Sequence, residues 1–226
     1  MVVDNHYSGR CPGVAYTFGL FEHKKLVGCV VFATPASYTL CNGVCGEKFS
    51  KQVVELARLV ITTKTPNAAS FLVGAALRGL PNLIIVSYAD CNEHVGHVGY
   101  VYQATNWMYT GRGSAEPIYV LENDHPSGLK AGTPVSYTRR HIDQKARDLG
   151  FAWKHNASTG PGLVRRKTIG KHRYLYITGD KRFRKKALEA LRYKVLTLPN
   201  GKPAYPKGPT RRHEGSVMEV ADRKGG

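Results

Sequence analysis

LIIVSYADCNEHVGHVGYVYQATNWMYTG, residues 83–111, passes from an apolar run into a dense set of polar and aromatic side chains. Residues 83–86 are apolar and mostly β-branched, which is typical of a central strand buried on both faces. Open α/β sheets bind their ligands beyond the carboxyl ends of the strands, because the loops there converge over a crevice. The polar side chains from Ser87 onward therefore predict a functional site at the end of a buried strand.

The segments before this stretch predict a hairpin and a crossover. Residues 15–20 and 26–33 are strand-like runs joined by a short polar connection, which predicts an antiparallel hairpin. Residues 34–49 are rich in Gly, Asn and Ser and predict a loop. Residues 53–62 return to a strand pattern. Together with the helix that follows, they predict a right-handed βαβ crossover over residues 53–86.

The helix of this crossover has clear boundaries in the sequence. Thr65 can cap it, Pro66 suits its first position, and Gly79 ends it. Its first turn presents backbone N–H groups to an anionic ligand, although TPNAAS lacks the glycines of a usual phosphate loop. Arg58 on the preceding strand could hold a carboxylate or phosphate of a ligand, or pair with an acidic side chain of the protein. The candidate cofactor-binding residues are Arg58, Pro66, Asn67, Ala68 and Ser70.

The net positive charge of the chain arises entirely in its second half. Residues 1–124 carry 9 basic and 9 acidic side chains, whereas residues 125–226 carry 24 and 7, so the whole net charge of +17 (24 − 7) arises there. Clustered positive charge is typical of nucleic-acid binding. We therefore expect a catalytic core at residues 1–124, a basic DNA-binding part at residues 125–198 that completes or extends the core, and a flexible basic tail at residues 199–226.

The basic half has secondary-structure signals of its own. Residues 117–122 predict a strand, and residues 173–178 alternate in the way of another strand. Thr138 can cap a helix that runs to Leu149, and Asp180 can cap a last helix. Basic side chains along these segments are suited to phosphate contacts. They are Arg139, Arg140, Lys145, Arg147, Arg165, Arg166, Lys167, Lys181, Arg182, Arg184 and Lys185.

The composition indicates a soluble intracellular protein. No stretch of about 18 apolar residues and no signal-peptide core occurs. The five cysteines are odd in number and lack a second paired cluster, so we expect reduced thiols and no disulfide scaffold.

Several separated motifs carry a family resemblance. The hairpin, RLVITTKTPNAASFLVGAALRGL, IIVSYAD and YQATNW follow one another in an order that resembles the GNAT acyltransferase superfamily. More specifically, six short motifs in the first half resemble the phage Mom family of adenine methylcarbamoylation proteins. They are HYSG at 6–9, ELARL at 55–59, PNAAS at 66–70, SYAD at 87–90, GHVG at 96–99 and YQATNWMYTG at 102–111.

The resemblance implies a GNAT-like α/β fold, with a mixed central sheet flanked by helices and a basic C-terminal extension. It also implies a phage enzyme, active in the cytoplasm of the bacterial host, that transfers a methylcarbamoyl group to the exocyclic amine of adenine. Double-stranded DNA is the implied partner, and no membrane is involved. Acetyl-coenzyme A or a related acyl donor and iron are the cofactors associated with the family. The stacked base would have to be flipped out of the duplex before it could react.

The candidate catalytic residues are Ser87, Asp90, His97, Tyr102 and Asn106. Asp90 could orient or deprotonate an amine, or bind a hard metal, or simply cap the loop after its strand. Asp90 and His97, with His94, resemble the carboxylate and two imidazoles that suit non-haem iron, although His97 could equally be a loop histidine bonded to the backbone.

The resemblance assigns Tyr102 a role of its own. A helix tyrosine of the GNAT superfamily, four residues before a Gly-Phe pair, often protonates the departing thiolate, and Asn106-Trp107 occupies the place of that pair here. Without the resemblance, Tyr102 would be more simply a core residue, and Asn106 would suit either an adenine edge or local capping. Two other function classes stay open: an acetyltransferase that acts on RNA or protein, and a non-catalytic nucleic-acid-binding protein on a GNAT-like core.

Overall fold

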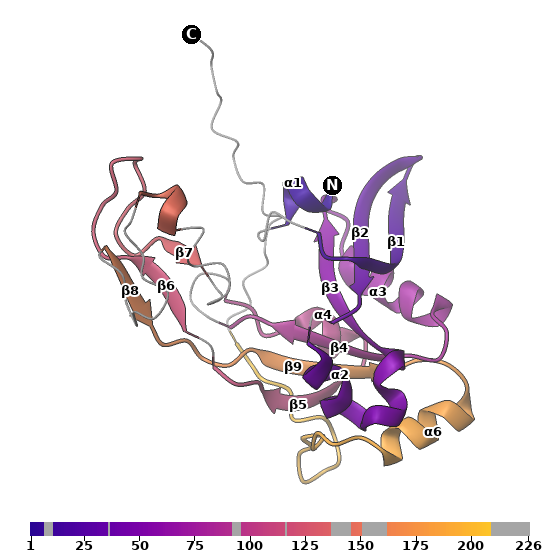
Figure 1. Cartoon of the computed structure of the whole chain (residues 1–226). Helices are drawn as coiled ribbons and strands as arrows, with labels where there is room; N and C mark the ends of the chain where they lie inside the picture. The colour runs from indigo at the N-terminus through magenta and orange to yellow at the C-terminus, as the bar shows by residue number, and fades with distance from the viewer. Residues whose placement is uncertain are drawn as a thin grey trace. The chain divides into compact units, whose positions relative to one another are not determined.

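The computed structural model describes residues 1–6, 11–35, 37–91, 96–115, 117–136, 146–150 and 162–208 (Figure 1). The chain divides into two compact units. The first unit comprises Met1–Ala89, His97–Gly111 and His172–Gly226, and the second comprises Asp90–Gly96 and Arg112–Lys171. The chain therefore leaves the first unit twice, after Ala89 and after Gly111, and returns to it at His97 and at His172.

The first unit is built on a six-stranded sheet with the strand order β1-β2-β3-β4-β9-β5. The pairs β1–β2, β2–β3 and β4–β9 are antiparallel, whereas β3–β4 is parallel. The predicted hairpin and βαβ crossover are both confirmed by this topology. The strands are β1 (Val14–Glu22), β2 (Lys25–Ala33), β3 (Val53–Ile61), β4 (Ile84–Ala89), β5 (Met108–Arg112) and β9 (His172–Ile177).

Helices cover both faces of this sheet. On one face, α3 (Ala68–Gly79) and α4 (Tyr100–Ala104) pack over a core that includes Phe32, Ile85 and Trp107. On the other face, α2 (Tyr38–Cys45), the 3₁₀ helix η1 (Glu47–Gln52) and α6 (Lys181–Glu189) pack over a second core. β4 contributes to both cores because its alternate side chains point to opposite faces, as its apolar run predicts.

The second unit is a small sheet with the order β7-β6-β8. Its strands are β6 (Ile118–Leu121), which confirms the predicted strand at residues 117–122, β7 (Pro134–Ser136) and β8 (Leu163–Arg166). Tyr119, Leu121, Ala146 and Leu163 form its core. The structure is thus a mixed α/β protein with helices on both faces of its larger sheet, and the assignment to the GNAT fold stays a prediction.

The prediction of a loop over residues 34–49 is wrong, because α2 and η1 occupy most of it. The Ser37 hydroxyl caps α2 by accepting a hydrogen bond of 3.2 Å from the Leu40 backbone N–H. Val44 and Phe49 are buried against the sheet. Burial of these side chains outweighs the low helix propensity of Asn42 and Gly43 within α2.

The helix of the crossover begins later than predicted. Asn67, with a left-handed backbone (φ 60°), is the residue that precedes α3, and Pro66 lies outside the helix. Thr65 does not cap it, because the Thr65 hydroxyl donates to a Glu22 carboxylate oxygen at 2.7 Å. The predicted end at Gly79 and the predicted cap of α6 are confirmed, since Asp180 Oδ1 accepts from the Phe183 backbone N–H at 2.8 Å.

The first ten residues of the expected flexible tail, residues 199–208, belong to a segment that is hydrogen-bonded to the rest of the first unit. We call this segment, residues 196–208, the C-terminal strap, and the flexibility of the tail stays a prediction. None of the helices in the described part of the chain is long and apolar enough to cross a membrane.

Candidate functional site

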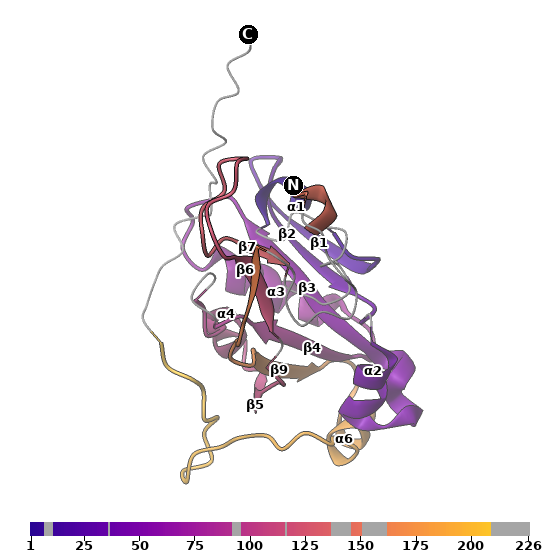
Figure 2. The same cartoon turned by 60° about the vertical axis from the view of Figure 1, so that its left-hand side comes forward.

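The parallel strands β3 and β4 part from each other at the place where the sequence predicts a site. They pair only at Val53–Ile84, Val54–Ile85 and Glu55–Val86. Beyond these pairs β3 continues beside β2 as far as Ile61, and β4 continues beside β9 as far as Ala89. Figure 2 shows the two strands running apart from the end that lies next to α2. The β-ladder between them therefore opens at their carboxyl ends, where α/β sheets bind ligands.

Two of the predicted catalytic residues meet where the strands part. The Ser87 hydroxyl lies 2.9 Å from the Leu56 carbonyl oxygen of β3 and 2.7 Å from the Tyr102 hydroxyl of α4. Both Ser87 and Tyr102 are buried. Ser87 has one proton for these two acceptors, so it donates either to the Leu56 carbonyl oxygen of β3 or to the Tyr102 hydroxyl, and it lies within hydrogen-bond distance of both. The structure thus brings together Ser87 and Tyr102, which are 15 residues apart in sequence.

Gly99 explains why the GHVG motif ends in glycine. Its φ of 81° favours glycine, and a Cβ at this position would lie 2.7 Å from ring atoms of both Tyr102 and Tyr174. The Tyr102 ring packs against Tyr174 at 5.0 Å and against Trp107 at 5.1 Å between centroids. These close approaches fix the position of the Tyr102 ring on the buried side of α4.

A groove of about 410 Å³ lies between α3 and the end of α4. We call it the α3–α4 groove. It brings two predicted cofactor-binding residues, Asn67 and Ser70, together with the predicted catalytic residue Asn106. Both asparagines have left-handed backbones, at φ 60° and 59°, a conformation that asparagine adopts more readily than most residues. The lining also includes Phe71, Gly74, Leu77, Arg78, Ala104, Thr105 and Tyr176, but not Pro66 or Ala68.

The Glu22 carboxylate lies close to the amino-terminal end of α3. The Glu22 carboxylate accepts hydrogen bonds from Thr63 at 3.0 and 3.1 Å and from Thr65 at 2.7 Å, two residues before Asn67. A pyrophosphate bound at this helix end would meet that negative charge within the same few residues. The α3 amino terminus therefore does not fit the pyrophosphate of acetyl-coenzyme A, and we derive no step through that cofactor.

Arg58 and His97 form a separate cluster with a residue that the sequence analysis did not select, His6. The Arg58 guanidinium donates to the Ala57 carbonyl oxygen at 2.6 Å. Burial, with the charges of Arg58 and His97 nearby, lowers the pKa of His6 from 6.5 to about 4. The HYSG motif at residues 6–9 was the only signal in the sequence for His6.

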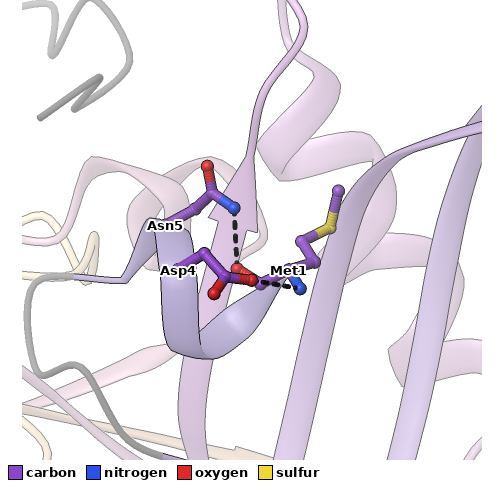
Figure 3. Close-up of polar contacts among 3 residues, drawn as sticks. All are labelled: Met1, Asp4 and Asn5. Carbon is purple, nitrogen blue, oxygen red and sulfur yellow. Dashed lines mark hydrogen bonds and ion pairs between the residues drawn. The ribbon is translucent and has the colours of Figure 1, made fainter. Parts of the chain in front are cut away.

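The short helix α1 (Val2–Asn5) holds His6 in this cluster, because α1 lies against β3. Asp4 Oδ2 is 3.1 Å from the Met1 amino group, and Asn5 Nδ2 donates to the Met1 carbonyl oxygen at 2.8 Å (Figure 3). The His6 backbone N–H donates to the Val2 carbonyl oxygen at 3.0 Å and so closes the turn. One turn of helix cannot hold itself in water, so these bonds and the contact with β3 are what position His6.

The lowered pKa of His6 predicts a pH-dependent stability. The unfolded chain protonates His6 near pH 6.5, whereas the folded chain resists protonation until about pH 4, so stability falls as the pH drops through this window. In the His6→Gln variant this loss of folding stability at low pH should be absent. The measurement is the unfolding free energy of both proteins by urea titration from pH 7 to pH 4, the lower end being the folded pKa of about 4. A constant difference between them would show that His6 does not titrate in this way.

Asp90 belongs to the second unit, where its carboxylate forms an ion pair with Lys171 at 2.9 Å. The Asp90 side chain is buried, whereas that of Lys171 is 47% exposed. His94 lies outside the described residues. Among the residues that the structure describes, no group of three or more His, Cys, Asp or Glu is placed to hold a metal. Because the predicted iron site includes His94, it stays a prediction, and we derive no step through iron.

The opposite face of the sheet carries a polar group that sequence reasoning missed. The Arg173 guanidinium lies 3.5 Å above the centre of the Tyr193 ring, and its Nε donates to the Thr110 hydroxyl at 2.9 Å. Tyr88 lies nearby, and burial raises the pKa of its hydroxyl to about 12 despite the charge of Arg173. Tyr88 therefore stays protonated at neutral pH. No sequence spacing links these residues, because they come from three strands, β4, β5 and β9, and from the segment after α6.

Several of the predicted DNA-binding residues are exposed. Lys181, Arg182, Arg184 and Lys185 project from α6, and Lys185 has a long ion pair of 4.0 Å with Glu189. In the second unit, Arg147, Arg165, Arg166 and Lys167 are also exposed. Arg139, Arg140 and Lys145 lie outside the described residues. The positive charge at the amino-terminal end of α6 opposes the helix dipole, so an anionic partner would stabilise it.

Comparison with known proteins identifies the family of the chain. No curated protein matches the sequence. The model of the Mom protein family matches residues 1–200, which include the sheet of the first unit, the residues at the parted strands, the α3–α4 groove and α6. Because this match spans most of the 226 residues, the chain belongs to the Mom protein family.

Proposed function

We propose that the chain transfers a methylcarbamoyl group to the exocyclic amine of adenine in double-stranded DNA, and so protects phage DNA from restriction. The family supplies the coarser part of this statement, since Mom proteins are DNA-modifying enzymes of phages that act on adenine. The transferred group and the mechanism are our proposal. The observation that carries it is the meeting of Ser87 and Tyr102 where β3 and β4 part.

This arrangement supports acyl-type transfer for a physical reason. Beyond Glu55 the backbone of β3 has left its ladder with β4, and the Ser87 hydroxyl bonds the Leu56 carbonyl oxygen instead. Acyl-type transfer needs a proton donor for the leaving group, and a hydroxyl held by a fixed partner can supply that proton. The Tyr102 hydroxyl is such a group, because it is hydrogen-bonded to Ser87 in a buried environment that strengthens the bond.

In the proposed reaction, the adenine amine attacks the carbonyl carbon of the donor. A bond forms between the amine nitrogen and that carbon, and the bond from the carbon to the leaving group breaks. Tyr102 donates a proton to the leaving group, with Ser87 as its hydrogen-bond donor, and the amine proton passes to a base, for which His97 is our candidate. Acetyl-coenzyme A and iron stay outside this scheme, and Asp90 has no assigned step.

The α3–α4 groove is our candidate for the donor site. It is large enough for a small organic donor, and it offers amide groups from Asn67 and Asn106 beside apolar and aromatic walls. The flipped adenine would come from DNA held by phosphate contacts with exposed residues such as those of α6.

Gly74 allows a direct test of the groove. A Cβ at Gly74 would meet only Arg78 and Thr105, at 3.7 and 3.9 Å, so a side chain there projects into the groove without a backbone clash. Gly74→Trp should therefore abolish adenine modification, with at least about a 10²-fold loss if the donor binds there. Nucleoside mass spectrometry of DNA from expressing cells measures the modification.

Gly74→Ala is the matched control. Alanine adds one methyl group at ordinary contact distances and replaces glycine inside a helix, so it should keep activity and raise stability by about 1 kcal/mol. Both variants should bind DNA with the affinity of the parent protein. Full activity in a folded Gly74→Trp protein would move the donor site away from the groove and leave the roles of Ser87 and Tyr102 to be judged separately.

A further inference from the structure

The C-terminal strap returns to the first unit through a short hairpin-like turn. The Leu196 backbone N–H donates to the Tyr109 carbonyl oxygen at 2.8 Å, and the Ala204 backbone N–H donates to the Leu196 carbonyl oxygen at 2.9 Å. Thr197 and Pro203 form an isolated β-bridge across the turn. These bonds bring the end of the strap back alongside the core.

Three further bonds join the end of the strap to the segment that carries Tyr102. The Tyr205 hydroxyl donates to the Trp107 carbonyl oxygen at 2.7 Å. The Gln103 amide donates to the Pro206 carbonyl oxygen at 3.1 Å, and the Tyr100 hydroxyl donates to the Gly208 carbonyl oxygen at 2.7 Å. The strap is thus bonded before, beside and after Tyr102.

The same bonds continue into the packing around the Tyr102 ring. The Gln103 amide also lies 3.2 Å from the Tyr174 hydroxyl, and Tyr174 in turn donates to the Val98 carbonyl oxygen. The Tyr174 ring packs against Tyr102 at 5.0 Å and against Tyr205 at 6.3 Å. Tyr205 therefore contacts the aromatic cluster through Tyr174 and Trp107.

α4 needs such support, because it is only five residues long. A helix of this length is not stable by itself, so the direction of the Tyr102 hydroxyl is set by what surrounds it. A shift of about 1 Å in a catalytic group can cost on the order of 10²-fold in rate.

We propose that the C-terminal strap is a positioning element that holds Tyr102 against Ser87, with Tyr205 as its anchor. This inference rests on the proposed role of Tyr102 as proton donor. Tyr205, Pro206 and Gly208 lie beyond residue 200, where the match to the family model ends. In this proposal the strap acts on catalysis through Tyr102.

Tyr205→Phe tests the anchor, because it removes one hydroxyl and keeps the ring. The rate at which modified adenine accumulates after induction, at equal protein abundance, should fall about tenfold, which is less than the cost of a full misplacement by about 1 Å because the bonds from Gln103 and Tyr100 to the strap remain. Affinity for duplex DNA should stay within about twofold of the parent value, because the substitution changes no charge. Tyr38→Phe removes an exposed hydroxyl of α2 and is the matched control, with no change expected.

A double-mutant cycle with Tyr102→Phe separates this inference from the proposed function. If the strap acts through Tyr102, adding Tyr205→Phe to Tyr102→Phe should lower the rate less than about twofold further. Multiplying losses in the double variant, or an unchanged rate in Tyr205→Phe alone, would overturn the positioning role and leave the proposed function intact. An unchanged rate in Tyr102→Phe alone would remove the proton donor from the proposed function, and the positioning role with it.

Discussion

Replacing Tyr102 with phenylalanine should lower the rate of adenine modification by about 10²-fold or more, the usual scale of general-acid catalysis. The ring contacts with Tyr174 and Trp107 would remain. Ser87 would also keep an acceptor, the Leu56 carbonyl oxygen at 2.9 Å, so no buried hydroxyl would be left without a partner. The cost in stability should therefore be about 1 kcal/mol or less.

The rate and the fold must be measured on the same preparations. Modified adenine is quantified by nucleoside mass spectrometry, the fold by thermal unfolding, and DNA affinity by titration of a labelled duplex. Tyr38→Phe serves as the control here too, since Tyr38 is 67% exposed. Turnover equal to that of the parent protein would reduce Tyr102 to a core residue, which is the alternative its burial also allows.

Removing four charges from α6 should weaken DNA binding steeply. The variant Lys181→Gln, Arg182→Gln, Arg184→Gln, Lys185→Gln changes only exposed side chains, so it should fold normally. The slope of log affinity against log salt is negative, and each lost phosphate contact reduces its magnitude by about 0.9. The loss of four contacts would therefore reduce that magnitude by about 3 to 4. At moderate salt the affinity itself should fall on the order of 10²-fold.

Lys24→Gln with Lys25→Gln provides the control for this experiment. Both lysines are exposed in the β1–β2 region and lie in the half of the sequence that has no net charge. Their loss should leave the salt slope unchanged. If the two sets of substitutions weakened binding equally per charge, the interaction would be a general effect of net charge, and α6 would not be part of a DNA interface.

Elements with strong local signals could be predicted from the sequence. The β1–β2 hairpin, the crossover from β3 to β4 and the Asp180 cap of α6 each depend on neighbouring residues, and all are confirmed. α2 was missed because its glycine and asparagine resemble a loop, whereas the burial of Val44 against the sheet and the Ser37 cap stabilise it. The position of β9 between β4 and β5 depends on pairing across about 90 residues, which no local pattern reveals.

The residues of the candidate site also divide into those that the sequence predicts and those that depend on contacts between distant segments. Ser87 and Tyr102 were predicted from the end of a buried strand and from a family resemblance, and the structure places their hydroxyls 2.7 Å apart. The meeting of His6 with Arg58 and His97 was not predicted, because it depends on α1 packing against β3. The strap was taken for a flexible tail because proline, glycine and charge dominate it, whereas a bond such as Tyr205 to Trp107, 98 residues apart, leaves no trace in composition.

Two rival functions make different predictions for these variants. A non-catalytic nucleic-acid-binding protein would show the salt dependence of α6 but no chemistry that Tyr102→Phe or Gly74→Trp could reduce. An acetyltransferase acting on RNA or protein would leave DNA unmodified and would add an acetyl group to one of those substrates. Both rivals are therefore excluded or supported by the product that the chain makes.

The most direct test is nucleoside mass spectrometry of plasmid DNA from bacterial cells that express the full chain. The account predicts deoxyadenosine that carries the additional mass of a methylcarbamoyl group, and it predicts that Tyr102→Phe, expressed to the same level, yields far less of it. DNA containing only unmodified deoxyadenosine, from cells in which the protein is folded and binds DNA, would contradict the account.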